Sequence, residues 1–112
     1  MEVKFGNALG VADKHRGWFA GNFVGDDGDL QHSNEVEIKW GTHKAGDSRQ
    51  EWSNNKATSM SILIHGRFRL NFINEEHILL NEGDYAIWAP GVSHTWQAEE
   101  DTLILTVRWP SL

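Results

Sequence analysis

Residues 83–94, with the sequence GDYAIWAPGVSH, contain a short strand between two turns and end in a histidine. Gly83-Asp84 is a turn dipeptide, and the apolar run that follows it is rich in strand formers. Pro90-Gly91 predicts a second turn, after which His94 opens another strand. The stretch therefore predicts two consecutive strands joined by a tight loop, with an imidazole at the start of the second strand.

Outside this stretch, apolar and polar residues alternate in short segments. Val36, Ile38 and Trp40 share one face of residues 35–40 and charged residues share the other, which is the period-two pattern of a half-buried strand. Residues 68–72 alternate in the same way. Further strands are expected at residues 59–64, 77–80, 94–98 and 102–109. Strands spaced by roughly 8–12 residues, without a convincing amphipathic helix, predict an all-β sandwich or barrel.

The composition limits the classes of function. At 112 residues the chain is expected to form a single domain, in which residues 1–34 supply N-terminal strands and loops. The net charge of −6 and ten scattered basic residues argue against a nucleic-acid partner. No apolar run approaches the ~20 residues of a membrane span, and the first residues lack a secretory signal, so a cytoplasmic protein is expected. The absence of cysteine excludes disulfides, thiolate ligands and thiol nucleophiles.

The spacing G-D-x4-A-P-G-x-x-H resembles the second signature of the cupin family. Asp84 and Gly91 match that signature, and His94 falls where the family keeps a metal-binding histidine. The proline has moved by one place, so that Ala89 stands at its usual position and Pro90 follows. The resemblance implies a cupin-type double-stranded β-helix, or jelly-roll barrel, whose core spans residues 35–109.

The first cupin signature supplies two histidines and a glutamate that hold the metal together with the histidine of the second signature. Gly46 and Gly66 fit the opening and closing glycines of this first signature. Between them, the two histidine positions fall on Trp52 and Asn54, and the glutamate position falls on Ser59. The resemblance therefore preserves the glycines of the motif but not its ligands.

A one-residue slip of the alignment moves the histidine positions to Ser53 and Asn55, which are no better as ligands. A divalent transition metal needs three or more good donors from imidazole or carboxylate groups. We therefore expect no standard metal site and no cofactor. An atypical site remains open, in which His94 acts with His43 or His65 and a nearby carboxylate.

An aromatic pocket around His94 is the alternative to a metal site. Trp96 lies two residues further along the strand and therefore points to the same side as His94. If that side is the interior of the barrel, the two residues form an aromatic wall beside an imidazole. Trp52 and Asn54 would line the same cavity if the strict alignment holds.

Arg108 is the fifth candidate ligand-binding residue. On regular alternation it shares a face of its strand with Ile104 and Thr106. An inward Arg108 would bind a carboxylate through its planar fork, whereas an outward one would be a solvated charge.

Three classes of function are compatible with these residues. The first is a binding module that holds a small molecule, such as a sugar, an aromatic compound or a carboxylate, without a metal. The second is an enzyme, because the family includes oxygenases, isomerases and lyases and because a histidine titrates near neutral pH. The third is a structural protein whose tryptophans bury a dimer surface. The resemblance implies a homodimer in each case, formed by strand exchange or sheet packing.

Overall fold

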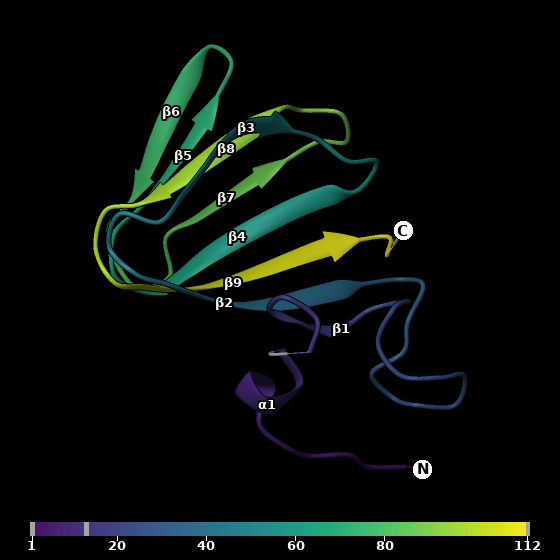
Figure 1. Ribbon diagram of the computed structural model, residues 1–112. Helices are drawn as coiled ribbons and strands as arrows, with labels where there is room; N and C mark the ends of the chain where they lie inside the picture. Colours follow the sequence, from purple (N-terminus) through teal and green to yellow (C-terminus); the bar gives the residue numbers. More distant parts are fainter. Residues whose placement is uncertain (1, 13, 112) are drawn as a thin grey trace.

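The computed structural model describes residues 2–12 and 14–111 and shows two antiparallel sheets that pack against each other (Figure 1). The elements in chain order are α1 (Ala8–Ala12), β1 (Trp18–Ala20), β2 (Glu37–His43), β3 (Ser48–Ser53), β4 (Thr58–His65), β5 (Phe68–Phe72), β6 (Glu75–Leu79), β7 (Tyr85–Trp88), β8 (His94–Ala98) and β9 (Thr102–Trp109). No helix of the described residues is long and apolar enough to cross a membrane.

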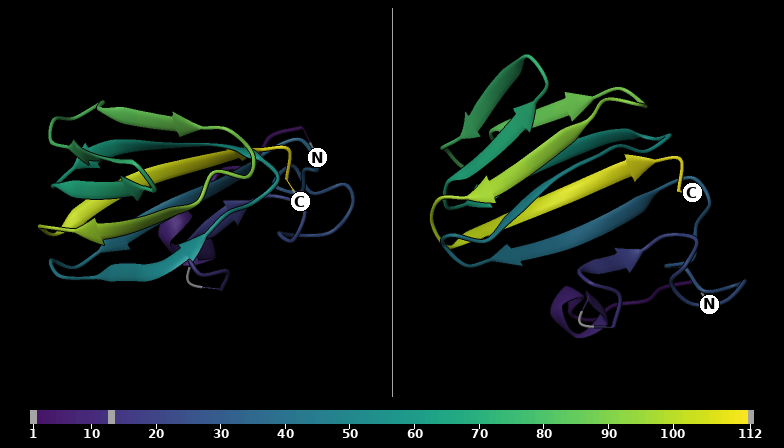
Figure 2. Two further views of the ribbon diagram at one scale, coloured as in Figure 1. Left: turned by 90° about the horizontal axis from the view of Figure 1, so that it is seen from above. Right: turned by 45° about the horizontal axis from the view of Figure 1, so that its top comes forward.

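The two sheets differ in size and enclose the interior of the barrel (Figure 2). The larger sheet has the strand order β1-β2-β9-β4-β7 and the smaller sheet has the order β3-β8-β5-β6. Strands far apart in the sequence are neighbours: β2 and β9 pair from Glu37↔Arg108 to His43↔Thr102. This non-local antiparallel pairing in two facing sheets confirms the predicted all-β jelly-roll barrel.

The turns of the opening motif form as predicted, and they position His94. Gly83 and Gly91 both adopt positive φ values, +91° and +83°, which favour glycine. The carboxylate of Asp84 accepts hydrogen bonds from the backbone N–H groups of Leu80 and Asn81 (3.0 and 2.9 Å) and closes the turn before β7. These bonds lower the pKa of the Asp84 carboxyl below its usual value.

The apolar core lies between the sheets and draws on both of them. Leu63 and Ala98 are fully buried, and the other members of the core cluster are Phe68, Leu70, Leu79, Trp88 and Ile104. Burying one such leucine or phenylalanine side chain contributes about 1.5–3 kcal/mol. Phe68 and Leu70 share the inner face of β5, as the alternation in residues 68–72 predicted.

The larger sheet does not follow the usual apolar-inside pattern. Lys39 lines the interior of the barrel and Glu37 is only 5% exposed, whereas Ile38 and Trp40 lie on the opposite, outer face of β2. The strand predicted at residues 35–40 therefore forms, but its polar side chains point inward. The polar side chains of this strand can lie in the interior because charged and hydroxyl groups of neighbouring strands lie beside them.

The cross-strand register shows the same arrangement on four strands, with apolar side chains outside and polar side chains inside. One outer row consists of Ile38, Val107, Met60 and Ile87, and a second consists of Trp40, Leu105, Ile62 and Tyr85. Between them lies an inner row that consists of Lys39, Thr106, Ser61 and Ala86. The outer surface of the larger sheet is therefore apolar where its inner surface is largely polar.

The N-terminal segment differs from the prediction of strands and loops alone. It contains the short helix α1, which the sequence pattern did not predict, and a single strand, β1, at the edge of the larger sheet (Figure 1). β1 pairs with β2 and places Trp18 opposite Lys39. The segment therefore supplies an aromatic side chain next to the basic residue of the barrel interior.

Candidate functional site

A cavity of about 90 Å³ lies between the two sheets. Its lining includes three cationic side chains, two histidines, two hydroxyl groups and an aromatic wall. These residues are Lys39, Arg49 and Arg108, His43 and His94, Ser61 and Thr106, and Phe68, Trp88 and Trp96, with Gly41, Leu70 and Ile104 completing the lining. The cavity thus combines apolar walls with a few convergent polar groups, as small-molecule sites do.

Three of the five residues predicted to bind a ligand line this one cavity: His94, Trp96 and Arg108. His94 and Trp96 project from the same face of β8, and Arg108 projects inward from β9 with Ile104 and Thr106. The inward alternative for Arg108 is therefore the one that the structure shows.

Trp52 and Asn54 do not line the cavity, contrary to the strict alignment of the first signature. Trp52 is 52% exposed on β3, and the Asn54 amide donates a hydrogen bond to Ser93 Oγ (3.4 Å). The pairing of β3 with β8 shifts register between Arg49 and Ser53. Because such an irregularity changes which side chains face inward, the signature spacing alone misplaces both residues.

Aromatic rings surround both histidines of the cavity. The His94 ring lies 4.9 Å from the Trp88 ring, and the His43 ring lies 4.3 Å from the Trp96 ring, measured between centroids. Phe68 stacks on Trp96 at 5.4 Å. His94 is 5% exposed, and its Nδ1 lies 3.3 Å from the carbonyl oxygen of Val92. The walls are therefore rigid, flat and largely apolar.

The guanidinium of Arg108 is held from two sides. Its Nη1 donates to Glu37 Oε2 (3.4 Å), and its carbon atom lies 4.6 Å from the centroid of the Trp18 ring. The same ring lies 5.8 Å from Lys39 Nζ. Glu37 also accepts a hydrogen bond from Ser111 Oγ (3.0 Å). A cation–π contact of this kind contributes about 0.5–2 kcal/mol and fixes the position of the charge.

Sequence reasoning missed Lys39 and Arg49, which belong to the same cavity. Lys39 stands among residues of an apparently solvated polar face, so nothing in the strand itself marks it as internal. Its position opposite Thr106, on the face of β9 that also carries Arg108, is visible only in the cross-strand register. Arg49 reaches the cavity from β3, an exposed strand at the edge of the smaller sheet.

The basic groups of the cavity influence one another. Burial lowers the pKa of Lys39, and the guanidinium groups of Arg108 and Arg49 lower it further. Burial also lowers the pKa of Arg108 and of both cavity histidines. Arg108 adds to the lowering of the pKa of His94, and Lys39 adds to that of His43. The interior therefore disfavours additional positive charge.

Two buried hydrogen-bond donors of the cavity residues have no acceptor. These are Trp88 Nε1 and Arg108 Nε, neither of which contacts a hydrogen-bond partner among the described residues. An unpaired buried donor costs about 1–3 kcal/mol. Both atoms can only donate, so the group that would satisfy them is an acceptor.

The positions that the cupin resemblance assigns to metal ligands hold weak donors. Ser53 lies opposite His94 in the β3–β8 register, and the Asn55 amide donates to Ser59 Oγ (3.4 Å), so the one-residue slip matches the fold. Among residues 2–12 and 14–111, no group of three His, Cys, Asp or Glu side chains lies close enough to hold a metal ion. Serine and asparagine side chains at these positions do not fit a cupin metal.

The atypical metal set that the sequence left open is not gathered around His94. His43 lines the cavity, but His65 is exposed at the end of β4. His65 instead lines a separate groove of about 210 Å³ together with His43, Asp47 and Asp101. β4 changes register with β9 between Leu63 and His65, so the strand parity that pointed His65 inward does not hold.

A larger groove of about 680 Å³ opens between the edge strands β6 and β7. Its walls include Phe72, Ile78, Tyr85 and Val92, and it shares Trp88 with the cavity. The groove contains none of the five residues predicted to bind a ligand. Its size alone therefore does not make it the better candidate site.

No family model and no curated protein matches the sequence. Solved structures do match. KdgF from Halomonas sp. is 17% identical with a TM-score of 0.65, over 72% of this chain and 75% of its own. A cupin-superfamily protein from Desulfitobacterium hafniense is 14% identical with a TM-score of 0.64, over 70% of each chain. A Streptococcus pyogenes protein of unknown function is 13% identical with a TM-score of 0.66, over 100% of this chain and 94% of its own. The similarity lies in the fold, and it shows that this chain has the cupin fold that its second signature predicted.

Proposed function

We propose that the protein binds a small molecule in the barrel cavity and does so without a metal ion. The observation that carries this proposal is the convergence of His94, Trp96 and Arg108 from two sheets on one cavity. A barrel kept only for packing would be expected to fill this space with apolar side chains, as in the Leu63 core. Here polar groups face the space instead.

The geometry favours binding over metal-dependent catalysis because the donor set around His94 does not fit a transition metal. A lone histidine can still exchange a proton with a bound ligand. Burial lowers the pKa of His94, so the neutral imidazole predominates at neutral pH and offers one donor and one acceptor to the ligand.

Tryptophan emission provides a direct test, because Trp88 and Trp96 form the walls of the cavity. Small sugars, aromatic compounds and carboxylates would be titrated into the wild type and into His94→Ala. Ligand-dependent quenching that is lost in His94→Ala supports the proposal. His65→Ala is the matched control, because this exposed histidine lies outside the cavity.

The groove between β6 and β7 requires its own control, since it shares Trp88 with the cavity. Ile78→Ala changes the groove and leaves the cavity lining intact. Quenching that survives in His94→Ala but disappears in Ile78→Ala would move the binding site to the groove and overturn the proposal.

A further inference from the structure

The cavity concentrates positive charge in an otherwise acidic protein. Lys39, Arg49 and Arg108 all line it, and no Asp or Glu belongs to its lining within the described residues. The chain as a whole carries a net charge of −6. Glu37 pairs with Arg108 from outside the lining (3.4 Å). One carboxylate therefore stands against three cations.

We propose that the ligand of this cavity is a compact organic anion that carries a carboxylate. This inference rests on the proposed function, because it names the chemical class bound at the same site. The Arg108 guanidinium can donate two parallel hydrogen bonds to a carboxylate, and Lys39 adds a point charge. The aromatic wall formed by Trp88 and Trp96 accommodates the carbon skeleton.

Cavity size limits the ligand. A volume of about 90 Å³ corresponds to roughly three water molecules, which suits a carboxylate of about three carbon atoms. The Ser61 and Thr106 hydroxyls lie 2.9 Å apart, with one hydrogen shared between them. The other hydroxyl hydrogen of the pair can be donated to a ligand oxygen.

The charge balance of the cavity favours an anion. Burial is the main cause that lowers the pKa of Lys39, and the guanidinium groups of Arg108 and Arg49 lower it further, as expected where positive groups face one another without enough counter-charge. An anion supplies the missing negative charge, and its oxygen atoms accept hydrogen bonds from the cationic groups.

Calorimetric titration with malonate and with its neutral diamide, malonamide, tests the role of charge. Malonate is expected to bind at least about tenfold more tightly than malonamide and to lose affinity as salt is added. Sulfate and phosphate test whether the carbon skeleton matters, and both are expected to bind more weakly than malonate. Acetate and glycolate define the preferred size.

Variants locate the site. Arg108→Gln is expected to weaken malonate binding by at least about tenfold, and Lys39→Met is a second variant that keeps the volume of the side chain. Lys56→Gln makes the same charge change at an exposed loop residue and is expected to leave the affinity unchanged. Circular dichroism verifies that each variant is folded.

The outcomes separate the two proposals. Equal affinities for malonate and malonamide would overturn the anion inference and leave the binding function intact. Tighter binding of sulfate than of malonate would overturn the organic part of the inference. If no tested ligand binds, neutral ones included, both proposals fail. Malonate binding that Lys56→Gln weakens as much as Arg108→Gln would place the anion outside the cavity and overturn the inference.

A second, independent observation concerns the outer face of the larger sheet. Ten apolar residues lie there on β2, β4, β7 and β9: Ile38, Trp40, Met60, Ile62, Tyr85, Ile87, Leu103, Leu105, Val107 and Trp109. Tyr85, Ile87 and Trp109 are 62%, 52% and 40% exposed. None of the ten belongs to the core cluster or packs against it. We refer to these ten residues as the apolar face.

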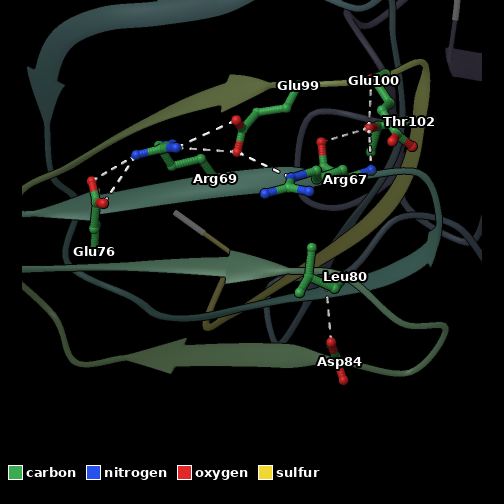
Figure 3. Close-up of polar contacts among 8 residues, drawn as sticks. All are labelled: Arg67, Arg69, Glu76, Leu80, Asp84, Glu99, Glu100 and Thr102. Carbon is green, nitrogen blue, oxygen red and sulfur yellow. Dashed lines mark hydrogen bonds and ion pairs between the residues drawn. The ribbon is translucent and has the colours of Figure 1, made fainter.

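The outer face of the smaller sheet is different, because it carries ion pairs. Arg69 on β5 lies between Glu76 and Glu99, and Arg67 lies on the other side of Glu99 (Figure 3). The Arg69–Glu76 pair is 3.0 Å long and the Arg69–Glu99 pair 3.3 Å. The exposed side of that sheet therefore has the chemistry expected of a solvated surface, and the apolar face does not.

The cupin resemblance implies a homodimer, and we infer that the apolar face is the surface through which two copies of this chain pack. Four strands about 4.8 Å apart and between about 13 and 26 Å long give a face of roughly 430 Å² per copy. Two copies would bury about 860 Å², which corresponds to a weak, concentration-dependent dimer rather than an obligate one. A two-fold arrangement satisfies both faces at once, because apolar rows of the two sheets can interdigitate as in a β-sandwich.

The oligomeric state tests this inference. Light scattering at high protein concentration is expected to give a dimer for the wild type and a folded monomer for Leu105→Glu, at the centre of the apolar face. Tyr85→Lys, on the exposed edge strand, is a milder second variant. Gln97→Glu places a charge on the outer face of the smaller sheet and is expected to leave the dimer intact. A monomeric wild type, or a dimer that persists in both variants, would overturn the inference.

Discussion

The two faces of the larger sheet invert the usual order of a half-buried sheet. Its inner face carries Lys39, Ser61, Thr106 and Arg108 toward the cavity, while its outer face carries apolar rows. The smaller sheet keeps the usual order, with Phe68 and Leu70 inside and ion pairs outside. The larger sheet therefore provides most of the polar groups of the interior, and it shares the apolar core with the smaller sheet through Leu63, Trp88 and Ile104.

Alternation along a strand therefore identifies two faces but not which one is buried. A strand with polar residues on one side fits a solvated surface and a polar cavity equally well. Whether the polar face is buried depends on the opposite sheet and on the charged residues of neighbouring strands. The predictions below test this distinction, and those with the greatest consequence for stability come first.

A matched pair on β4 compares the faces directly. Leu63→Ala opens a cavity in the core and is expected to lower the free energy of unfolding by about 3 kcal/mol. Ile62→Ala, one residue away on the apolar face, is expected to cost less than about 1 kcal/mol in the dilute monomer. Urea denaturation measures both. Equal losses would mean that the apolar face is already covered within one chain.

Removing a cation from the inner face is expected to stabilise the fold. Lys39→Met relieves the repulsion from Arg108 and Arg49 and the cost of burying the ammonium group, which raises the free energy of unfolding by about 1 kcal/mol. Thermal unfolding measures the change, with the exposed Lys56→Met as control. A less stable Lys39→Met would show that Lys39 supports the fold rather than the binding of an anion.

Acidification is expected to destabilise the protein through the cavity histidines. The pKa values of His94 and His43 are lowered from 6.5 in the folded state. The unfolded chain therefore binds more protons, and stability is lost as the pH falls below 6.5. Urea denaturation at several pH values measures this loss. His94→Gln should reduce it, whereas His65→Gln, outside the cavity, should not.

A second loss of stability at lower pH comes from the carboxylates. The hydrogen bond from Arg69 is the main cause that lowers the pKa of Glu99 from 4.5, and this contribution disappears as Glu99 is protonated. This loss occurs at lower pH than the loss caused by the histidines. A stability that stays constant as the pH falls from 6.5 to the carboxylate range would contradict the burial of His94 and His43.

Trp52→Ala is expected to have the smallest effect. The side chain is 52% exposed on β3 and does not line the cavity. The free energy of unfolding should change by no more than about 0.5 kcal/mol, and malonate affinity should stay the same. Calorimetry of the variant measures both. A loss of affinity would return Trp52 to the binding site, where the strict alignment placed it.

Much of the fold could be predicted because its signals are local. The turns around Gly83 and Gly91 need positive φ, so their chemistry is visible in the sequence. The alternation along β9 also grouped Arg108 correctly with Thr106. The predicted site was incomplete where non-local pairing decides the outcome. Lys39 becomes internal through its register with β9, and the irregular pairing of β3 turns Trp52 away.

Trp18 connects the N-terminal segment to the proposed ligand site. Its ring lies 4.6 Å from the Arg108 guanidinium carbon, although β1 precedes the whole barrel core of residues 35–109. A shortened chain that began at Glu35 would keep every residue that lines the cavity, but its Arg108 would lose the aromatic contact and keep the one with Glu37. Removal of the N-terminal segment is therefore expected to change ligand preference without changing any residue of the cavity lining.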